Sequence, residues 1–466
     1  MTSKPFTPPI YELGPDFYDD VSAALFPKGI LRFRNQAAAE SIGLGNLSED
    51  QWKNYFWNFK SFPNNIKTPL ALRYHGHQFG VYNPQLGDGR GFLYAQFKSL
   101  ESNQEKILDL GTKGSGQTPY SRQGDGRLTL KGAFREALCT ELLESLGVNT
   151  SKTFSIFETG ENLQRGDEPS PTRSAVLVRL SHSHLRIGTF QRLARLNQTD
   201  QIKKLIQYSL KYYNFEKITT KNETEQAAEF LKIVVQRAAQ LVASYMVAGF
   251  VHGVLNTDNI NITGESFDYG PYRFLPHYDP HFTAAYFDHQ GLYCYERQPI
   301  SFLFALEQLA ASLIIAHPGL PILEILETFS PHFNDSLQNL FLKRLNLKSE
   351  NATQASELIA AFFNFLETKK VPFEQCFFDF FGGWQEERLQ KSLYWTEYTA
   401  SNLKTLLNEF EIADSKKLNH PYFQKINPET LLIDEIEALW KPIAEKDDWQ
   451  PFQQKIISLR SFRGIY

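Results

Sequence analysis

The stretch HGVLNTDN, residues 252–259, decides how the rest of the chain is interpreted, because it joins a long apolar segment to DYG at residues 268–270. The preceding segment, residues 222–250, carries Leu, Val, Ala and Tyr at intervals of three and four, and its start resembles a capping box. This pattern predicts a long central helix that ends shortly before His252. The polar residues that follow are therefore expected to lie in a loop that the core holds in place.

The spacing inside this loop is similar to that of the protein kinase catalytic loop. In the kinase pattern HRDLxxxN the histidine precedes the asparagine by seven positions, and His252 precedes Asn259 by the same seven. Val254 stands where a kinase has its catalytic aspartate, so Asp258 is the nearest carboxylate that could accept a proton. Asp268 matches the aspartate of the kinase DFG motif, and with Asn259 it would supply two oxygen ligands for Mg²⁺ or Mn²⁺. Such a loop also occurs by chance, but its place behind the helix favours metal binding.

Two glycine-bearing loops lie upstream and share the tetrapeptide Gly-Asp-Gly-Arg. In PQLGDGRG, Gly87 and Gly89 would let backbone N–H groups fold around phosphate oxygens, and Arg90 would add donors. In RQGDGR, Asp125 and Gly126 belong to a loop that could approach a phosphate or a ribose. Tight turns and solvated loops have the same composition, so a nucleotide-binding loop and an ordinary turn both remain open.

A lysine and a glutamate complete the set of residues that a nucleotide site requires. Residues 91–100 and 106–114 are apolar, strand-like runs that predict a hairpin, and Lys113 falls at the end of its second strand. Residues 128–146 predict a helix that carries Glu136. The two side chains follow one another in the chain as the kinase lysine and helix glutamate do. Lys113 could instead be an ordinary surface lysine at a strand end, but the presence of Glu136 on the next helix favours an ion pair.

Two arginines lie where a kinase has the hinge that contacts adenine. Arg179 and Arg186 bracket the sequence RLSHSHLR at the junction between the strand-rich and helix-rich parts of the chain. Adenine is uncharged and does not require two cations, whereas phosphate groups are anionic and bind them. This placement favours a nucleotide bound in the reverse direction, with its phosphates deep in the site, although two surface arginines would have the same spacing.

The order of the predicted elements gives the fold class. Strand-like segments at residues 152–158 and 175–181 follow the predicted helix, and beyond about residue 186 the pattern is helical. We therefore predict an α+β, bilobal, protein-kinase-like fold with a mixed N-lobe that contains an antiparallel sheet (residues 1–185) and a helical C-lobe (residues 186–466). The first ~70 residues are Pro-rich and irregular, apart from a helix expected at LSEDQWKNYF.

Composition and charge exclude several functions. The 466 residues include 48 Lys+Arg and 52 Asp+Glu, so a net charge of −4 gives no reason to expect binding to nucleic acid or an anionic membrane. No apolar window reaches the ~20 residues that cross a bilayer, and the N-terminus does not resemble a signal peptide. The three cysteines lack the spacing of a disulfide framework or a thiolate zinc site. We expect a cytoplasmic protein and a monomer.

Histidines in HGH, HSH and HYDPH have spacings typical of metal ligands. Two histidines two positions apart on a strand share a face, yet zinc needs three or four ligands, and no such set is evident in the sequence. Structural zinc therefore stays an alternative without a complete ligand set.

Taken together, these motifs are similar to those of the selenoprotein O family. The resemblance covers most of residues 70–300 and is carried by YHGHQFGVYNPQLGDGRG, KGSGQTPYSRQGDGR, SHLRIGTF, HGVLNTDNINITGESFDYGPYRF and YDPHF. It implies a kinase-like fold and transfer of AMP from ATP to protein hydroxyl groups, with the nucleotide in reversed orientation. Many members end in a cysteine or selenocysteine motif, whereas this chain ends SLRSFRGIY, so we expect no redox control through the tail.

The resemblance also implies a role for each residue of the predicted site. Asp258 would be the catalytic proton acceptor, Asn259 and Asp268 would bind the metal, and Glu136 would position Lys113. The nucleotide would be held by Gly87, Gly89, Arg90, Lys113, Asp125, Gly126, Arg179, Arg186 and Asp268.

Three functions follow from this set and remain open. An enzyme that transfers AMP from ATP to Ser, Thr or Tyr hydroxyls of target proteins, with possible use of UTP, is favoured by the arginine pair. A protein kinase that transfers the γ-phosphate is disfavoured by Val254 at the position of the kinase base. A pseudokinase that only binds ATP is disfavoured by the complete set of Lys, Glu, Asn and Asp residues.

Overall fold

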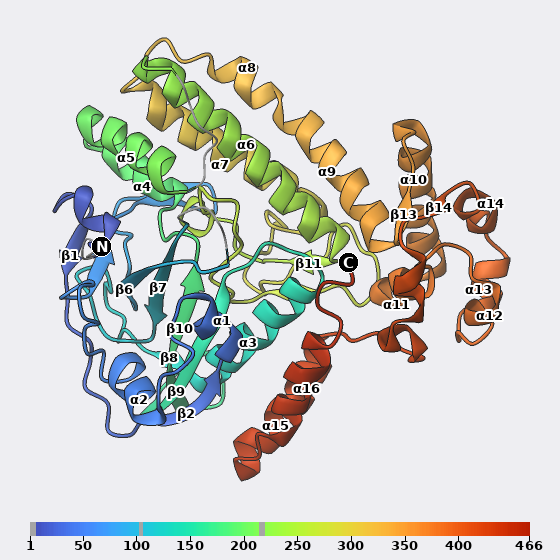
Figure 1. Ribbon diagram of the computed structural model, residues 1–466, viewed down its shortest axis with the longest axis horizontal. Coiled ribbons are helices and arrows are strands. Elements are labelled where there is room, and N and C mark those ends of the chain that lie inside the picture. The colour runs from blue at the N-terminus through green and yellow to red at the C-terminus, as the bar shows by residue number, and fades with distance from the viewer. Residues whose placement is uncertain (1–5, 102–105, 214–219) are drawn as a thin grey trace, which may run out of the picture.

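One twisted antiparallel sheet forms the centre of the N-terminal half (Figure 1). The computed structural model describes residues 6–101, 106–213 and 220–466. The strands lie in the order β1-β3-β6-β7-β10-β9-β2, and β8 pairs with β10 outside this path. The strands are β1 (Tyr18–Asp20), β2 (Ile30–Arg34), β3 (Leu70–Leu72), β6 (Leu93–Lys98), β7 (Ile107–Lys113), β8 (Leu128–Thr129), β9 (Lys152–Leu163) and β10 (Thr172–Ser181).

The central strands follow the order predicted from the sequence. β6 and β7 form the expected antiparallel pair, although residues 102–105 between them lie outside the described residues. β9 and β10 pair along most of their length and are buried on both faces, so Leu177 packs on one side of the sheet and Val176 on the other. The predicted helix is α3 (Leu130–Ser145), which packs against β9 and β10. The α+β class and the antiparallel sheet are confirmed.

Residues 6–70 contain more regular structure than their composition indicated. β1 and β2 form the two opposite edges of the main sheet, and α1 (Gln36–Ser41) and α2 (Glu49–Phe56) cover the face away from α3. The expected helix start is confirmed, since Ser48 caps α2 and Gln51 completes a capping box. Three- and five-residue strands are too short to show a periodicity, which explains why they were not predicted.

Helices dominate the chain after residue 186, as the sequence predicted. α6 (Glu223–Val247) is capped by Asn222 and packs against α7, α8 and α9, with which it forms the long layer visible in Figure 1. None of the helices in the described part of the chain is long and apolar enough to cross a membrane. The others are α4 (Ile187–Arg195), α5 (Thr199–Tyr212), α7 (Gln298–Ile314), α8 (Ile322–Glu327), α9 (Phe329–Arg344), α10 (Ala352–Lys369), α11 (Phe373–Asp379), α12 (Glu386–Leu389), α13 (Trp395–Thr399), α14 (Leu403–Leu407), α15 (Ile433–Lys446) and α16 (Gln450–Arg460).

Within the described residues, three two-stranded ladders lie outside the main sheet. They pair β4 (Gly76–Gln78) with β5 (Val81–Asn83), β11 (Phe250–Val251) with β12 (Arg273–Phe274), and β13 (Leu347–Lys348) with β14 (Glu411–Ile412). The last pair interrupts a region that the sequence predicted as wholly helical.

The largest apolar cluster runs through both halves of the chain. It contains Leu177 of the sheet, Leu231 of α6 and Phe462 near the C-terminus. The predicted boundary at residue 185 therefore crosses a continuous core, and the division into lobes at that residue stays a prediction. All three cysteines are buried and free, and burial raises the pKa of each thiol.

The C-terminal helices return to the N-terminal half and are fixed there by a buried carboxylate. Glu141 of α3 is 2% exposed and accepts hydrogen bonds from Arg460 Nε at 2.8 Å and from Arg463 Nη2 at 2.6 Å. Figure 1 shows α16 beside α3. This charged contact joins distant segments of the chain, since Glu141 and Arg460 are separated by 319 positions in the sequence.

We predict that Glu141→Gln lowers the free energy of unfolding by about 1–2 kcal/mol, because two guanidinium groups lose a charged acceptor while staying partly hydrated. Glu445→Gln is the matched control: its partner Lys441 lies 4.0 Å away on an exposed surface, so a change within about 0.5 kcal/mol is expected. Urea unfolding measures both variants. Equal losses in the two would contradict a structural role for Glu141.

Candidate active site

The residues predicted from the sequence come together in one cleft of about 690 Å³. Its lining includes every residue to which a catalytic, nucleotide-binding or metal-binding role was assigned: Gly87, Gly89, Arg90, Lys113, Asp125, Gly126, Arg179, Arg186, Asp258, Asn259 and Asp268. Glu136 is not in the lining but lies behind Lys113, to which it is hydrogen-bonded. The structure therefore supports the grouping, and the individual roles remain predictions.

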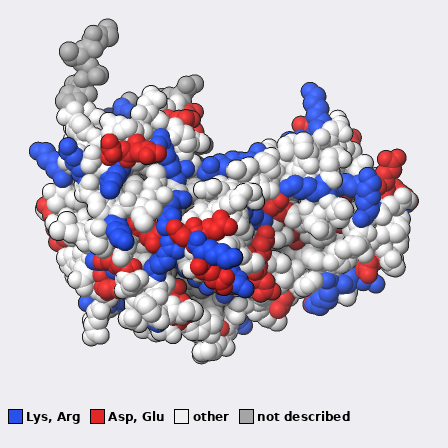
Figure 2. All heavy atoms as spheres, turned by 90° about the horizontal axis from the view of Figure 1, so that it is seen from below, with Lys and Arg blue, Asp and Glu red and all other residues white. Residues whose placement is uncertain are grey.

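The charge of the cleft is opposite to that of the whole chain. Of the described residues that line it, seven are Lys or Arg and four are Asp. On the face shown in Figure 2, by contrast, acidic and basic side chains are interspersed. A protein with a net charge of −4 thus concentrates cations around one cavity, which favours an anionic ligand.

A buried lysine joins three segments of the chain at this cleft. Lys113, at the end of β7, lies 2.6 Å from Glu136 Oε2 on α3 and 2.7 Å from Asp268 Oδ1. The side chains of Lys113 and Glu136 are 5% and 1% exposed, so the ion pair predicted from chain order exists in a dry environment. The second carboxylate belongs to the DYG segment, and the lysine therefore connects the sheet, α3 and the loop after the catalytic stretch.

Asp268 is held in an unusual conformation and in its charged form. Its φ of +64° lies in the left-handed region, which non-glycine residues rarely adopt and which is common at functional sites. Burial alone would raise the pKa of this carboxyl, but the surrounding ammonium and guanidinium groups hold it well below its usual range. Arg179 Nη1 lies 3.5 Å and Arg186 Nη1 4.0 Å from its oxygens.

Two buried guanidinium groups form the inner wall of the cleft. Arg186 lies between the rings of Tyr74 and Phe267, at 4.5 and 4.9 Å from their centroids, and Arg179 lies 5.2 Å from Phe267. Arg186 also donates to Asp88 Oδ1 at 3.2 Å. The Nε atoms of both arginines and Nη1 of Arg179 are buried without a hydrogen-bond partner. Unpaired buried donors of this kind fit a site that an anion completes.

The β4–β5 ladder forms hydrogen bonds with the stretch HGVLNTDN, residues 252–259. His77 N donates to Thr257 Oγ1 at 2.8 Å, and Phe79 N donates to Asn256 Oδ1 at 3.1 Å. A Cβ on Gly76 would lie 2.9 Å from the same Thr257 hydroxyl, so a side chain there would push the loop away. The HGHQF segment therefore positions the loop that the sequence singled out.

Asp258 and Asn259 present oxygen atoms that the protein does not use. Asp258 Oδ1 is buried without a hydrogen-bond partner, and burial raises the pKa of this carboxyl to about 6 against the opposing effect of Arg186. Asn259 donates through Nδ2 to the carbonyl oxygen of Val254 at 3.1 Å, which leaves its amide oxygen for another partner. One buried base and one oxygen ligand are what the predicted roles require.

The first Gly-Asp-Gly-Arg loop packs against the segment that leads into the second, through Thr118, Tyr120 and Ser121. A Cβ on Gly87 would lie 2.2 Å from the ring of Tyr120, and one on Gly89 would lie 2.9 Å from the carbonyl oxygen of the same tyrosine. Neither glycine has a positive φ, so close packing explains both residues in this structure. Gly126 differs, because its φ is +69°. Asp125 pairs with Arg165 at 2.8 Å near the rim.

Sequence reasoning missed the residues that hold the arginines. Asp88, between the two glycines, accepts a hydrogen bond from Leu72 N at 3.0 Å as well as from Arg186. Tyr74 and Phe267 supply the aromatic faces. Asp88 could have been found, since it lies inside a singled-out motif, but stacking of aromatic rings on a guanidinium leaves no spacing pattern.

The histidine motifs mostly have partners within the protein. The histidines of HGH and HSH form hydrogen bonds of 2.7 to 3.3 Å with neighbouring side chains. Among the described residues, one group has metal-like geometry: His281, Cys294 and Glu296, whose ligand atoms lie within 4.8 Å of one another. His281 is 79% exposed and its Nδ1 lies 2.8 Å from Glu296, so an ordinary ion pair accounts for their proximity.

Comparison with known proteins gives similarity over nearly the whole chain. The family model described as "Protein adenylyltransferase SelO" matches residues 1–460. The Protein nucleotidyltransferase YdiU of Trichormus variabilis is 42% identical over 476 residues, which cover 98% of this chain and 96% of the relative. The protein of that name from Trichodesmium erythraeum is 42% identical over 472 residues, with 97% of each chain covered. That of Synechocystis is 40% identical over 484 residues, with 98% of each chain covered.

We predict that Lys113→Met lowers the free energy of unfolding by about 3 kcal/mol, because it leaves two acidic side chains without their shared cation. Adding Glu136→Gln to this variant should restore part of the loss, since the buried charge is then removed as well. Lys131→Met is the control, because Lys131 forms a 2.7 Å pair with the largely exposed Glu437 and should cost less than about 1 kcal/mol. Additive effects of the first two substitutions would contradict a coupled pair.

Proposed function

The chain belongs to the SelO family of protein adenylyltransferases, and we propose on that premise that it transfers AMP from ATP to Ser, Thr or Tyr hydroxyl groups of other proteins. It is a protein nucleotidyltransferase, with ATP as co-substrate. Beyond this family activity, we propose the acceptor hydroxyls, the metal ion, the direction in which the nucleotide binds and the role of each residue.

The observation that supports the proposal most strongly is the pair of buried arginines at the inner wall. Arg179 and Arg186 are 4% and 3% exposed, stack on aromatic rings and retain unpaired donors. Adenine has no charge that could balance two guanidinium groups, whereas the β- and γ-phosphates are anionic and can balance them. Phosphates bound deep in the cleft would turn the α-phosphorus towards the catalytic loop.

A divalent cation, Mg²⁺ or Mn²⁺, fits the oxygen atoms near the loop. Asp268 is a carboxylate held in its charged form, and the amide orientation of Asn259 leaves an oxygen available. Hard cations prefer such ligands and leave the remaining positions to phosphates and water. When bound, the cation would offset phosphate charge at the reacting centre.

The protein's own residues can then carry the transfer. The Oδ1 atom of Asp258 has no hydrogen-bond partner and would accept the proton of the acceptor hydroxyl. The hydroxyl oxygen would form a bond to the α-phosphorus at the same time. The bond between the α-phosphorus and the bridging oxygen breaks, and pyrophosphate leaves with the electron pair. Lys113, positioned by Glu136, and the two arginines would bind the phosphates throughout.

A kinase-like bilobal arrangement is part of the proposal. Its support is the order of the parts along the chain: a glycine loop, a strand lysine that is paired with a helix glutamate, and a catalytic loop after a long helix. The lobes would comprise residues 1–185 and 186–466. Transfer of the γ-phosphate is the second candidate function, and the same order of parts favours it, but Val254 occupies the position of the kinase base.

We predict that only label at the α-phosphorus of ATP enters protein. Separate reactions with α- and γ-labelled ATP, using the purified enzyme itself and a heat-inactivated cell extract as acceptors, measure the incorporation that depends on the enzyme. Asp258→Asn should lower α-label transfer about 100-fold or more, because the hydroxyl proton loses its acceptor. Asp335→Asn, an exposed carboxylate on α9, is the control that should retain full activity. Entry of γ-label that Asp258→Asn abolishes would make the protein a kinase.

We predict that Asp268→Asn removes the gain in ATP affinity that Mg²⁺ provides. The wild type should bind ATP at least about tenfold more tightly with Mg²⁺ than with EDTA, whereas the variant should bind equally in both conditions. Because the variant has one negative charge fewer among the cations, its affinity in EDTA should not fall below that of the wild type. Calorimetry gives all four values, and an unchanged response to Mg²⁺ in the variant would exclude Asp268 as a metal ligand.

A further inference from the structure

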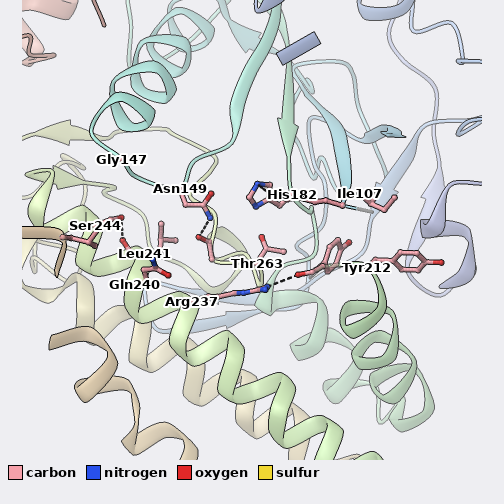
Figure 3. A pocket seen from close by; sticks show the side chains of 14 residues that line it. Ile107, Gly147, Asn149, His182, Tyr212, Arg237, Gln240, Leu241, Ser244 and Thr263 are labelled. Carbon is pink, nitrogen blue, oxygen red and sulfur yellow. Dashed lines mark hydrogen bonds between the residues drawn. The ribbon is translucent and has the colours of Figure 1, made fainter. Parts of the chain in front are cut away.

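A second pocket, of about 310 Å³, lies outside the proposed active site and shares no lining residue with it. It is bounded by the first residues of β7, the end of β10, the loop between α3 and β9, and the helices α5 and α6. Figure 3 shows Asn149, His182, Arg237 and Thr263 around the same space, although they come from four different segments. None of the roles assigned above uses this pocket.

Lys106 brings a positive charge into the pocket that no carboxylate of the described residues neutralises at ion-pair distance. Its ammonium donates to His182 Nε2 at 2.7 Å, so the histidine must accept through that nitrogen and be neutral. Burial agrees with this state, because it lowers the pKa of His182 to about 3. The pKa of Lys106 is itself lowered by burial.

Glu265 lies beside this pair, with its Oε1 3.6 Å from His182 Nε2. Glu265 is 2% exposed and accepts a hydrogen bond from the backbone N–H of His182 at 2.9 Å. Burial raises the pKa of Glu265 to about 8, so near neutral pH this group is largely protonated. It therefore adds little negative charge to balance Lys106.

Arg237 adds a second cation from α6. Its Nη1 donates to the carbonyl oxygen of Tyr213 at 3.2 Å, and Figure 3 shows this bond at the pocket wall. The turn at Gly264 lies directly against the arginine: its φ is +68°, and a Cβ there would lie 2.7 Å from Arg237 Cβ. Asn149 Nδ2 donates to the Gly264 carbonyl at 2.7 Å and fixes this turn. The site is thus built from several mutually supported segments.

We propose that this pocket binds a phosphomonoester that carries a small apolar body. A phosphomonoester has a charge of about −1.5 to −2 near neutral pH, which matches one ammonium and one guanidinium better than a carboxylate does. Ile107, Leu241 and Leu340 line the same pocket and would contact the apolar part. The inference goes beyond the proposed function and does not depend on it.

The pocket should accept this ligand while the active site is occupied. Both sites contact β7, where Lys106 precedes the strand and Lys113 ends it, and both contact the segment between Asn259 and Asp268. Because their linings are separate, a nucleotide in the cleft would not displace a ligand from the pocket.

Phenyl phosphate is a suitable probe, and calorimetry on the full chain saturated with Mg²⁺ and a non-hydrolysable ATP analogue isolates the second site. We expect one equivalent to bind under these conditions. Lys106→Met should weaken binding at least about tenfold, because the ammonium charge is lost, whereas Lys106→Arg should retain most of it. Lys232→Met is the control, since Lys232 lies on the same helix as Arg237 but is 51% exposed and pairs with Glu229.

Benzoate separates a phosphate site from a general anion site. It has the same ring and a single negative charge, so it should bind at least about tenfold more weakly than phenyl phosphate. Thermal unfolding of each variant establishes that the fold is intact. The proposal is overturned if the saturated enzyme binds no phenyl phosphate, if Lys106→Met and Lys232→Met bind it equally, or if benzoate binds as tightly.

Discussion

The ammonium of Lys113 is the point on which the arrangement of this protein depends. It lies between Glu136 and Asp268 with almost no contact with water, so both carboxylates share it as their ion-pair partner. This contact fixes the end of β7 against α3 and draws the DYG segment towards the sheet. α6 leads the chain into residues 252–259, which the β4–β5 ladder holds beside the same cleft through Thr257 and Asn256.

The second constraint is the burial of Arg179 and Arg186 in a chain whose net charge is negative. A buried guanidinium is costly unless its charge and its donors are compensated. Arg186 is compensated in part by two aromatic faces, Asp88 and a backbone carbonyl oxygen, yet donors on both arginines remain unused. These unused donors support the proposed orientation, in which the phosphates of the nucleotide would lie innermost.

Sequence reasoning succeeded where a pattern extends over many residues. The hairpin, α3, β9 with β10, and α6 with its Asn222 cap all follow from periodicity and capping chemistry, and the Lys113–Glu136 pair followed from chain order. The sequence did not predict elements whose partners lie far away in the chain and whose own sequence is too short to show a periodic pattern. β1 and β2 are strands only because the main sheet has free edges, and Glu141 binds arginines more than 300 residues further on, with |i−j| of 322 for Arg463. The aromatic faces on Arg186 leave no spacing pattern at all.

In the proposed complex, phosphates occupy the inner wall and the α-phosphorus faces residues 252–259. A crystal structure with a non-hydrolysable ATP analogue and Mg²⁺ tests it most directly. The account predicts that the β- and γ-phosphates contact Arg179 and Arg186, that the α-phosphorus lies nearest to Asp258, and that adenine lies towards the mouth of the cleft. Adenine stacked at the two arginines, with the γ-phosphorus next to Asp258, would contradict it.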